Sequence, residues 1–149
     1  MKTQILALAV LAVIGLTSCN KDDDKVTEPK VKTQKEILTE ERWQGKSTIS
    51  EYYYNGSLVD KEVENITDLS IKFEEDGKLI NYENGVATDT MSYTLLANNQ
   101  IKLDGSNLED GIVLVCDIST LNDKELKMIS TLEEPEDSIM VKLIFEFNK

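Results

Sequence analysis

Alternation of apolar and polar residues dominates the chain from Trp43 onward. Short segments with a period of two are separated by turn-forming Asn, Asp and Gly residues, a pattern typical of antiparallel strands with one buried face. The last segment is the most regular, because every second residue from Ile139 to Phe147 is apolar. The pattern predicts eight or nine strands: residues 43–54, a weaker segment at 58–63, and strands that start near positions 68, 78, 88, 100, 112, 125 and 138.

The turn residues predict how neighbouring strands pair. Asp76-Gly77 is a strong signal for a two-residue hairpin turn. Such a turn would pair Phe73 with Ile80 and Ile71 with Tyr82. Because a strand repeats every two residues, this register places all four side chains on one face.

Another hairpin requires an odd loop, that is, a loop with an odd number of residues. Ala97 to Asn99 form a three-residue connection that opposes Leu95 and Ile101, whereas a two-residue loop would put them on different faces. We expect Asn99 to supply the left-handed conformation that this loop needs.

All these strands are joined to their neighbours by short connections. A meander of this many antiparallel strands with one apolar face hides its edges best by closing on itself. The sequence therefore predicts an all-β, up-and-down antiparallel β-barrel of about eight strands, with a two-sheet β-sandwich as the alternative. Before the strands, Thr33-Gln34-Lys35-Glu36 has the form of a capping box and predicts a short helix to about Arg42.

Besides this helix, three later segments are distinctive: Trp43-Gln44-Gly45, the hairpin from Phe73 to Gly77, and the corner from Ile118 to Leu126. Together they resemble the lipocalin-like domains of bacterial lipoproteins, over about Glu36 to Phe147. In lipocalins a tryptophan at the start of the first strand closes the barrel floor, and the resemblance gives this role to Trp43. The family has a glycine before that tryptophan and an arginine over it, where this chain offers Glu41 and Lys142.

Closing the sheet would turn its shared apolar face into a lumen. An eight-stranded barrel is wide enough either to be filled by its own side chains or to hold one small molecule. Methionine fills irregular gaps and buried tyrosine seeks a hydrogen-bond partner, so a mixture of both favours an adaptable pocket for a small apolar ligand. The alternative is that these side chains simply fill the core. The candidate ligand-binding residues are Phe73, Tyr82, Met91, Tyr93, Met128 and Phe145.

Tyr52-Tyr53-Tyr54, before the turn at Asn55-Gly56, is the densest aromatic feature. Alternation must direct some of these rings outward, where tyrosines form protein contacts. A second hypothesis is therefore a surface or periplasmic module that binds a protein partner through this rim and has a filled barrel. A strand end made of β-forming aromatic residues is the simpler interpretation.

The N-terminal residues predict lipidation. An apolar run from Ile5 to Leu16 follows Lys2, and it has the length of a signal-peptide core rather than of a membrane-spanning helix. Leu16-Thr17-Ser18-Cys19 resembles the bacterial lipobox, in which the cysteine accepts a diacylglycerol. We expect residues 1–18 to be removed as a signal peptide and Cys19 to become the acylated, membrane-anchoring N-terminus. An ordinary secreted protein is the alternative.

Residues 19–32 are mostly polar and are interpreted as a tether to the domain at 33–149. Fully extended, roughly 14 residues reach about 45–50 Å from the membrane. Lys21-Asp22-Asp23-Asp24 resembles the acidic signal that exports lipoproteins to the cell surface in one large phylum of Gram-negative bacteria. We therefore expect anchoring at the outer membrane, with surface exposure if this signal operates. The alternative for the triplet is a solvated charge run.

Charge and residue types exclude several function classes. The chain has a net charge of −12, which becomes −13 once Lys2 is removed, so nucleic acid would repel it. It has no histidine, which removes imidazole catalysis and the commonest transition-metal ligand. Asp104-Gly105-Ser106-Asn107 misses the EF-hand spacing, and Cys116 lies in an apolar run that favours a core role. We expect a non-enzymatic protein with no cofactor and no metal.

Overall fold

The computed structural model describes residues 30–106, 108, 111–134 and 138–149. The predicted signal peptide, Cys19 and the acidic triplet lie outside these residues. Val31–Lys149 forms one compact unit, and every helix and strand of the described residues belongs to it. Within the described part of the chain, no helix is long and apolar enough to cross a membrane.

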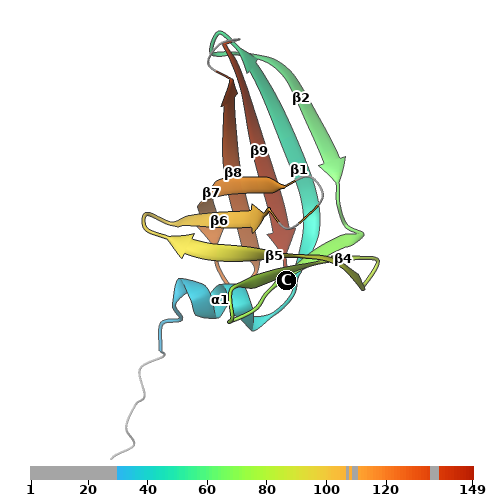
Figure 1. Cartoon of the computed structure of the whole chain (residues 1–149), viewed down its shortest axis with the longest axis vertical. Helices are drawn as coiled ribbons and strands as arrows, with labels where there is room; N and C mark the ends of the chain where they lie inside the picture. The colour runs from blue at the N-terminus through green and yellow to red at the C-terminus, as the bar shows by residue number, and fades with distance from the viewer. Residues whose placement is uncertain (1–29, 107, 109–110, 135–137) are drawn as a thin grey trace, which may run out of the picture. The chain divides into compact units, whose positions relative to one another are not determined.

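One short helix precedes nine strands (Figure 1). Helix α1 covers Gln34–Glu40. The strands are β1 (Trp43–Tyr54), β2 (Ser57–Asn65), β3 (Leu69–Phe73), β4 (Lys78–Glu83), β5 (Val86–Leu96), β6 (Gln100–Gly105), β7 (Ile112–Leu121), β8 (Glu125–Glu134) and β9 (Ile139–Asn148).

Eight of the strands close an antiparallel barrel. The order β1-β3-β4-β5-β6-β7-β8-β9 returns to β1, because β9 pairs with β1 along almost its whole length. Closure on the other side of β1 is short: only Trp43 and Gln44 pair with β3, opposite Ile71 and Ser70. The up-and-down barrel prediction is confirmed, and the sandwich alternative is wrong.

Strand β2 stands outside the barrel. It pairs with the remaining part of β1, from Ser47 to Tyr54, and has no other partner strand among the described residues. In Figure 1 the long strands β1, β2, β8 and β9 run upright, while β4, β5 and β6 cross them in the lower half. The upright strands therefore form a sheet that projects beyond the ring of the barrel.

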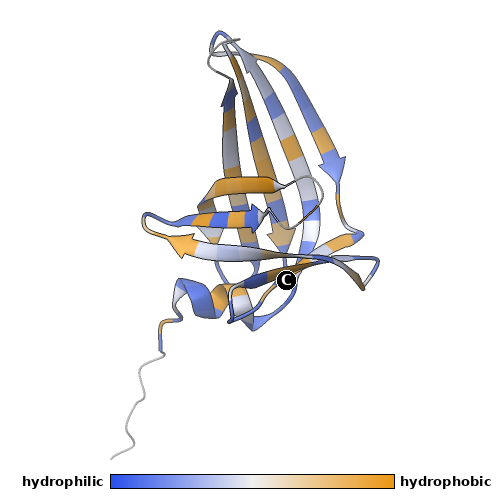
Figure 2. Cartoon of the chain, viewed as in Figure 1, coloured by the Kyte–Doolittle hydropathy of each residue, from blue (hydrophilic) through white to orange (hydrophobic). Residues whose placement is uncertain are grey.

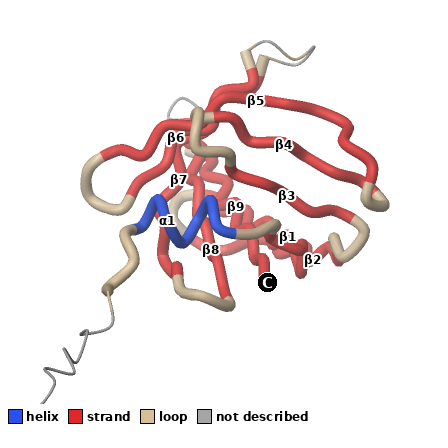
Figure 3. Tube along the Cα trace, turned by 90° about the horizontal axis from the view of Figure 1, so that it is seen from below, coloured by secondary structure: helices blue, strands red, loops and turns tan. Residues whose placement is uncertain are grey.

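Helix α1 lies under the barrel, as seen from below in Figure 3. Its capping box is complete: the Thr33 hydroxyl accepts from the Glu36 N–H at 3.2 Å, and the Glu36 carboxylate accepts from the Thr33 N–H at 2.7 Å. The helix is attached to the barrel by the Lys72 ammonium, which donates to the Thr39 carbonyl at 2.6 Å. The predicted helix and its capping box are confirmed.

The predicted register of the β3–β4 hairpin is wrong by one residue. Phe73 pairs with Leu79, and Ile71 pairs with Asn81. The connection is a longer loop, closed by the Glu74 N–H donating to the Lys78 carbonyl at 2.8 Å, with Gly77 at φ 88°. A shift by one residue moves alternate side chains to opposite faces, so Leu79 and Asn81 point inward.

The odd loop after β5 is confirmed. Leu95 pairs with Ile101, and Leu96 pairs with Gln100. Asn98 and Asn99 both adopt the left-handed conformation, with φ of 61° and 59°. The three-residue loop thus preserves the inward face between β5 and β6.

Apolar side chains from the inward faces of the strands form one core with Leu38 of the helix. Figure 2 shows the alternation along the long strands as bands of orange and blue. Cys116 is fully buried in this core, and burial raises the pKa of its thiol from 9.0 to about 11. The thiol is therefore neutral at ordinary pH and inert as a nucleophile.

This pKa shift predicts a loss of stability in alkali. Below pH 9 the thiol is protonated in both the folded and the unfolded chain, so its full stabilising contribution is present. Above that pH the unfolded chain releases the proton first, and stability falls until the folded thiol ionises near pH 11. At pH 10 the free energy of unfolding should fall by about 1.4 kcal/mol through this group. Urea unfolding at pH 8 and pH 10 measures the fall in stability, which should be smaller in Cys116→Ala by this amount. An equal fall in both proteins would contradict the assignment.

Candidate ligand-binding pocket

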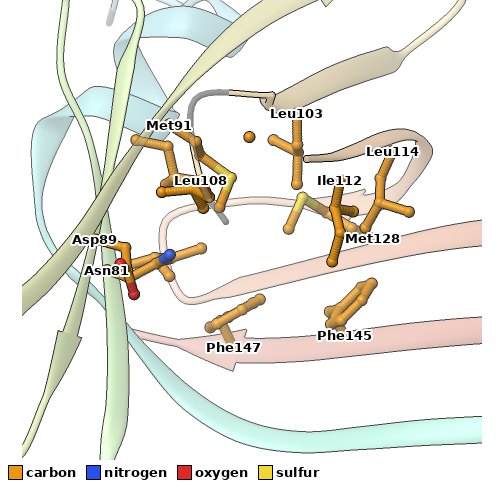
Figure 4. Close-up of a pocket in the computed structure, with 13 residues that line it drawn as sticks. Asn81, Asp89, Met91, Leu103, Leu108, Ile112, Leu114, Met128, Phe145 and Phe147 are labelled. Carbon is orange, nitrogen blue, oxygen red and sulfur yellow. The ribbon is translucent and has the colours of Figure 1, made fainter. Parts of the chain in front are cut away.

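The barrel encloses a cavity of about 470 Å³. Its wall is built by inward side chains of β3, β4, β5, β6, β7, β8 and β9 together with Leu108 of the loop after β6 (Figure 4). This volume is within the range of small-molecule sites, which are usually concave and mainly apolar. The lining residues are Ile71, Leu79, Asn81, Asp89, Met91, Leu103, Gly105, Leu108, Ile112, Leu114, Met128, Phe145 and Phe147.

Three of the six predicted lumen residues line this cavity, namely Met91, Met128 and Phe145. They come from three different strands: Met128 of β8 pairs with Phe145 of β9, and Figure 4 shows Met91 of β5 apart from these two. The alternation of apolar residues within β5, β8 and β9 was therefore sufficient to predict these three side chains as inward.

Phe73 and Tyr93 lie in the core and do not line the cavity. Their rings meet edge to face with centroids 5.0 Å apart. The Tyr93 hydroxyl donates to the Glu74 carbonyl at 2.9 Å, so its polar group is used to hold the β3–β4 loop. These two aromatic residues are structural.

Tyr82 neither lines the cavity nor belongs to the core cluster. The Arg42 guanidinium lies over its ring, 3.6 Å from the centroid, which is a cation–π contact. Tyr82 pairs with Ser70 in the shifted register, so alternation places it on the opposite face of β4 from the inward Asn81. Its prediction as a lumen residue is wrong because it depended on the two-residue turn.

No protein-family model matches the chain, and no curated protein matches it significantly. The candidate site therefore depends on geometry and chemistry alone.

Two polar side chains interrupt the apolar wall. Asn81 and Asp89 lie together at one end of the cavity in Figure 4, and the other lining side chains are apolar apart from Gly105. In the part of the chain that the structure describes, neither side chain has a hydrogen bond or an ion pair. The inward position of Asp89 follows from the alternation in β5. Asn81 could not be found from the sequence, because its orientation depends on the register of β4.

The opposite end of the cavity is open onto the projecting sheet. Beyond Phe145, the same face of β9 carries Leu143, Val141 and Ile139, and Leu132 of β8 pairs with Val141. Leu132 and Ile139 are 45% and 38% exposed. An apolar strip therefore leads out of the cavity along β9.

The floor of the barrel is sealed. Trp43 is fully buried, and its Nε1–H donates to the Leu38 carbonyl at 3.0 Å. The basic residue over its ring is Lys149, whose Nζ lies 4.8 Å from the ring centroid and 2.9 Å from the Glu40 carboxylate. Lys142, the basic residue that the sequence offered, instead lies 3.7 Å from Glu51, far along β9. The open strip therefore gives one way out of the cavity, and the exposed Asp89 marks a second place where the cavity meets solvent.

The three rim tyrosines do not form one patch. Tyr52 pairs with Val141 on the face that continues the lumen, and its hydroxyl donates to Glu62 at 3.3 Å. Tyr53 points to the other face, where its hydroxyl donates to Glu51 at 3.0 Å. Tyr54 is 54% exposed. A single contact surface made of all three rings is excluded by the alternation.

Proposed function

We propose that this protein is a membrane-anchored, non-enzymatic lipoprotein that binds a small apolar ligand in its barrel. The observation that carries the proposal is the cavity of about 470 Å³, whose wall is apolar except at Asn81 and Asp89. Burying apolar ligand surface there would supply about 25 cal/mol per Å² removed from water. With the floor closed, a ligand could enter along the open strip or beside the exposed Asp89.

The anchoring part of the proposal is supported by the sequence. The lipobox-like Leu16-Thr17-Ser18-Cys19 follows an apolar core of signal-peptide length. Lipid attachment at Cys19 would hold the barrel at the outer membrane, and Lys21-Asp22-Asp23-Asp24 favours exposure on the cell surface. A carrier in that position meets apolar molecules at the membrane.

The pocket proposal predicts the effect of filling the cavity. In Met91→Trp, the larger ring should occupy the space of the ligand and weaken binding of the neutral probe N-phenyl-1-naphthylamine by at least about tenfold. The melting temperature should change little, because the cavity has room for the added atoms. Fluorescence titration and a thermal melt of the chain from residue 20 onward measure both effects.

Met140→Trp is the matched control. Met140 lies on the opposite face of β9 from Phe145, so the Met140→Trp variant should bind the probe like the wild type. If the wild-type protein binds no probe and Met91→Trp loses about 1–3 kcal/mol of stability through overpacking, the interior is a filled core and the pocket proposal is wrong.

A second candidate function is protein binding through β2. All nine residues of this strand are exposed, and one of its edges has no partner among the described strands. An unpaired edge accepts an added strand, and Leu58 and Val63 are 52% and 65% exposed beside it. The double substitution Leu58→Lys and Val63→Lys should then abolish any specific chemical crosslink between this protein and its protein partner on intact cells. A crosslink unchanged by both substitutions would argue against this candidate.

A further inference from the structure

The two ends of the cavity differ in chemistry. Asn81 and Asp89 occupy one end, whereas Phe145, Leu114 and Met128 occupy the other (Figure 4). A ligand that fills the cavity therefore meets a polar group at one end only. This asymmetry fits an amphiphile better than a uniformly apolar molecule.

The polar end selects the charge of the ligand. An ionised carboxylate such as Asp89 only accepts hydrogen bonds, while the amide of Asn81 both donates and accepts. A ligand headgroup placed between them must therefore donate to Asp89. A carboxylate headgroup would face a like charge, and the chain already has a net charge of −12. An ammonium headgroup would pair with Asp89 and also donate to the Asn81 oxygen.

The apolar end selects the length of the ligand. The inward residues of β9 run from Phe147 to Ile139, eight steps along the strand, or about 27 Å at 3.4 Å per residue. The first two, Phe147 and Phe145, line the cavity, and the strip beyond them is partly exposed. A single extended chain can follow this path, whereas a compact ring system would use only the cavity.

We propose that the ligand is a single-chain amphiphile with a cationic, hydrogen-bond-donating headgroup. The headgroup lies at Asn81 and Asp89, and the chain passes Phe145 and continues over Val141 and Leu132. This assignment rests on the proposed function of the cavity and names the ligand class. Because Asp89 is exposed to solvent, its pairing with an ammonium is partly screened and discriminates moderately.

Headgroup selectivity tests the polar end. Decylamine, decanol and decanoate, all below their micelle concentrations, are titrated as competitors of N-phenyl-1-naphthylamine on the chain from residue 20 onward. Decylamine should bind at least about tenfold more tightly than decanoate, with decanol between them. Equal affinities, or tighter binding of decanoate, would overturn the headgroup assignment. If the neutral probe itself does not bind, the proposed function fails instead.

Substitution of the carboxylate tests the residue. Asp89→Asn keeps the shape and removes the charge, so it should bring the affinities of decylamine and decanoate to within about threefold of each other. Glu133→Gln, an equal charge change on the opposite face of β8 from Leu132, should keep the wild-type preference. The same preference in Asp89→Asn as in the wild type would overturn the role of Asp89.

Chain length tests the apolar strip. Leu132→Asn should weaken hexadecylamine several-fold and leave octylamine unchanged, because only the longer chain reaches the strip. Leu58→Asn on β2 is the matched control, since Leu58 pairs with Tyr53 on the other face of the sheet. An equal effect of Leu132→Asn on both amines, or none on either, would show that the chain does not follow β9.

Discussion

Gly45→Ala should destabilise the protein by about 3 kcal/mol, the upper end of the usual cost of overpacking. A Cβ at this position would lie 2.3 Å from the Ile66 carbonyl oxygen and 2.9 Å from the Leu69 carbonyl oxygen. Both are backbone atoms of the corner between β2 and β3, so neither can move without shifting the corner. The register of β1 against β9 already slips at this point, between Gly45 and Ser47.

The size of this effect follows from the short closure of the barrel. β1 pairs with β3 at Trp43 and Gln44 alone, and the Gln44 amide donates to the carbonyls of Thr67 and Leu69 at 2.6 and 2.8 Å. Displacing the corner would open the barrel wall there.

Urea unfolding at neutral pH measures the loss, and Gly85→Ala is the comparison. Gly85 has φ of +81° and no atom within 4 Å of an added Cβ, so alanine there bears only the backbone cost of about 1–2 kcal/mol. A loss in Gly45→Ala no larger than in Gly85→Ala would contradict the close approach.

Cys19→Ala should abolish lipidation completely. The chain contains two cysteines, and the fully buried Cys116 is inaccessible to acylating enzymes, so Cys116→Ala is the matched control. Cells grown with an alkyne-bearing palmitate should label the wild type and Cys116→Ala equally and Cys19→Ala not at all. The unlabelled variant should also keep residues 1–18, since lipobox cleavage follows acylation. Labelling of Cys19→Ala at the wild-type level would show that the N-terminal assignment is wrong.

Much of the fold could be predicted from local patterns because each strand carries its own signal. Alternation along Ile139 to Phe147 indicated an inward face, and two of these residues, Phe145 and Phe147, line the cavity. The odd loop at Ala97 to Asn99 was predictable because parity requires it and asparagine tolerates the left-handed conformation.

The β3–β4 hairpin was not predictable in the same way. Asp76-Gly77 can form a two-residue turn by themselves or the last two residues of a longer loop. The longer loop is stabilised by the hydrogen bond that the Tyr93 hydroxyl donates to the Glu74 carbonyl. Tyr93 belongs to another hairpin, so this contact is tertiary and leaves no mark in the local pattern. A register shift of one residue was enough to place Asn81 on the cavity wall instead of Tyr82. The sequence therefore did not predict Asn81, one of the two polar residues of the cavity.

The position of β2 outside the barrel also could not be predicted from the local sequence. Residues 58–63 predicted only a weak strand, because the apolar Leu58, Val59 and Val63 do not alternate regularly with the charged residues between them. That the strand lies outside the closed ring follows from the corner at Gly45, where the backbone of the chain after β2 approaches β1. Only the packed structure reveals this approach.

The central claim is that the barrel lumen binds an apolar ligand, and its most direct test uses the methionines. Met91 and Met128 line the cavity, while Met140 lies on the opposite face of β9. In a chain from residue 20 onward with carbon-13-labelled methionine methyl groups, titration with decylamine should shift the NMR signals of Met91 and Met128 in a saturable way and leave that of Met140 in place. Signals of Met91 and Met128 that stay fixed up to the solubility limit of the ligand, or a shift of Met140 alone, would contradict the account.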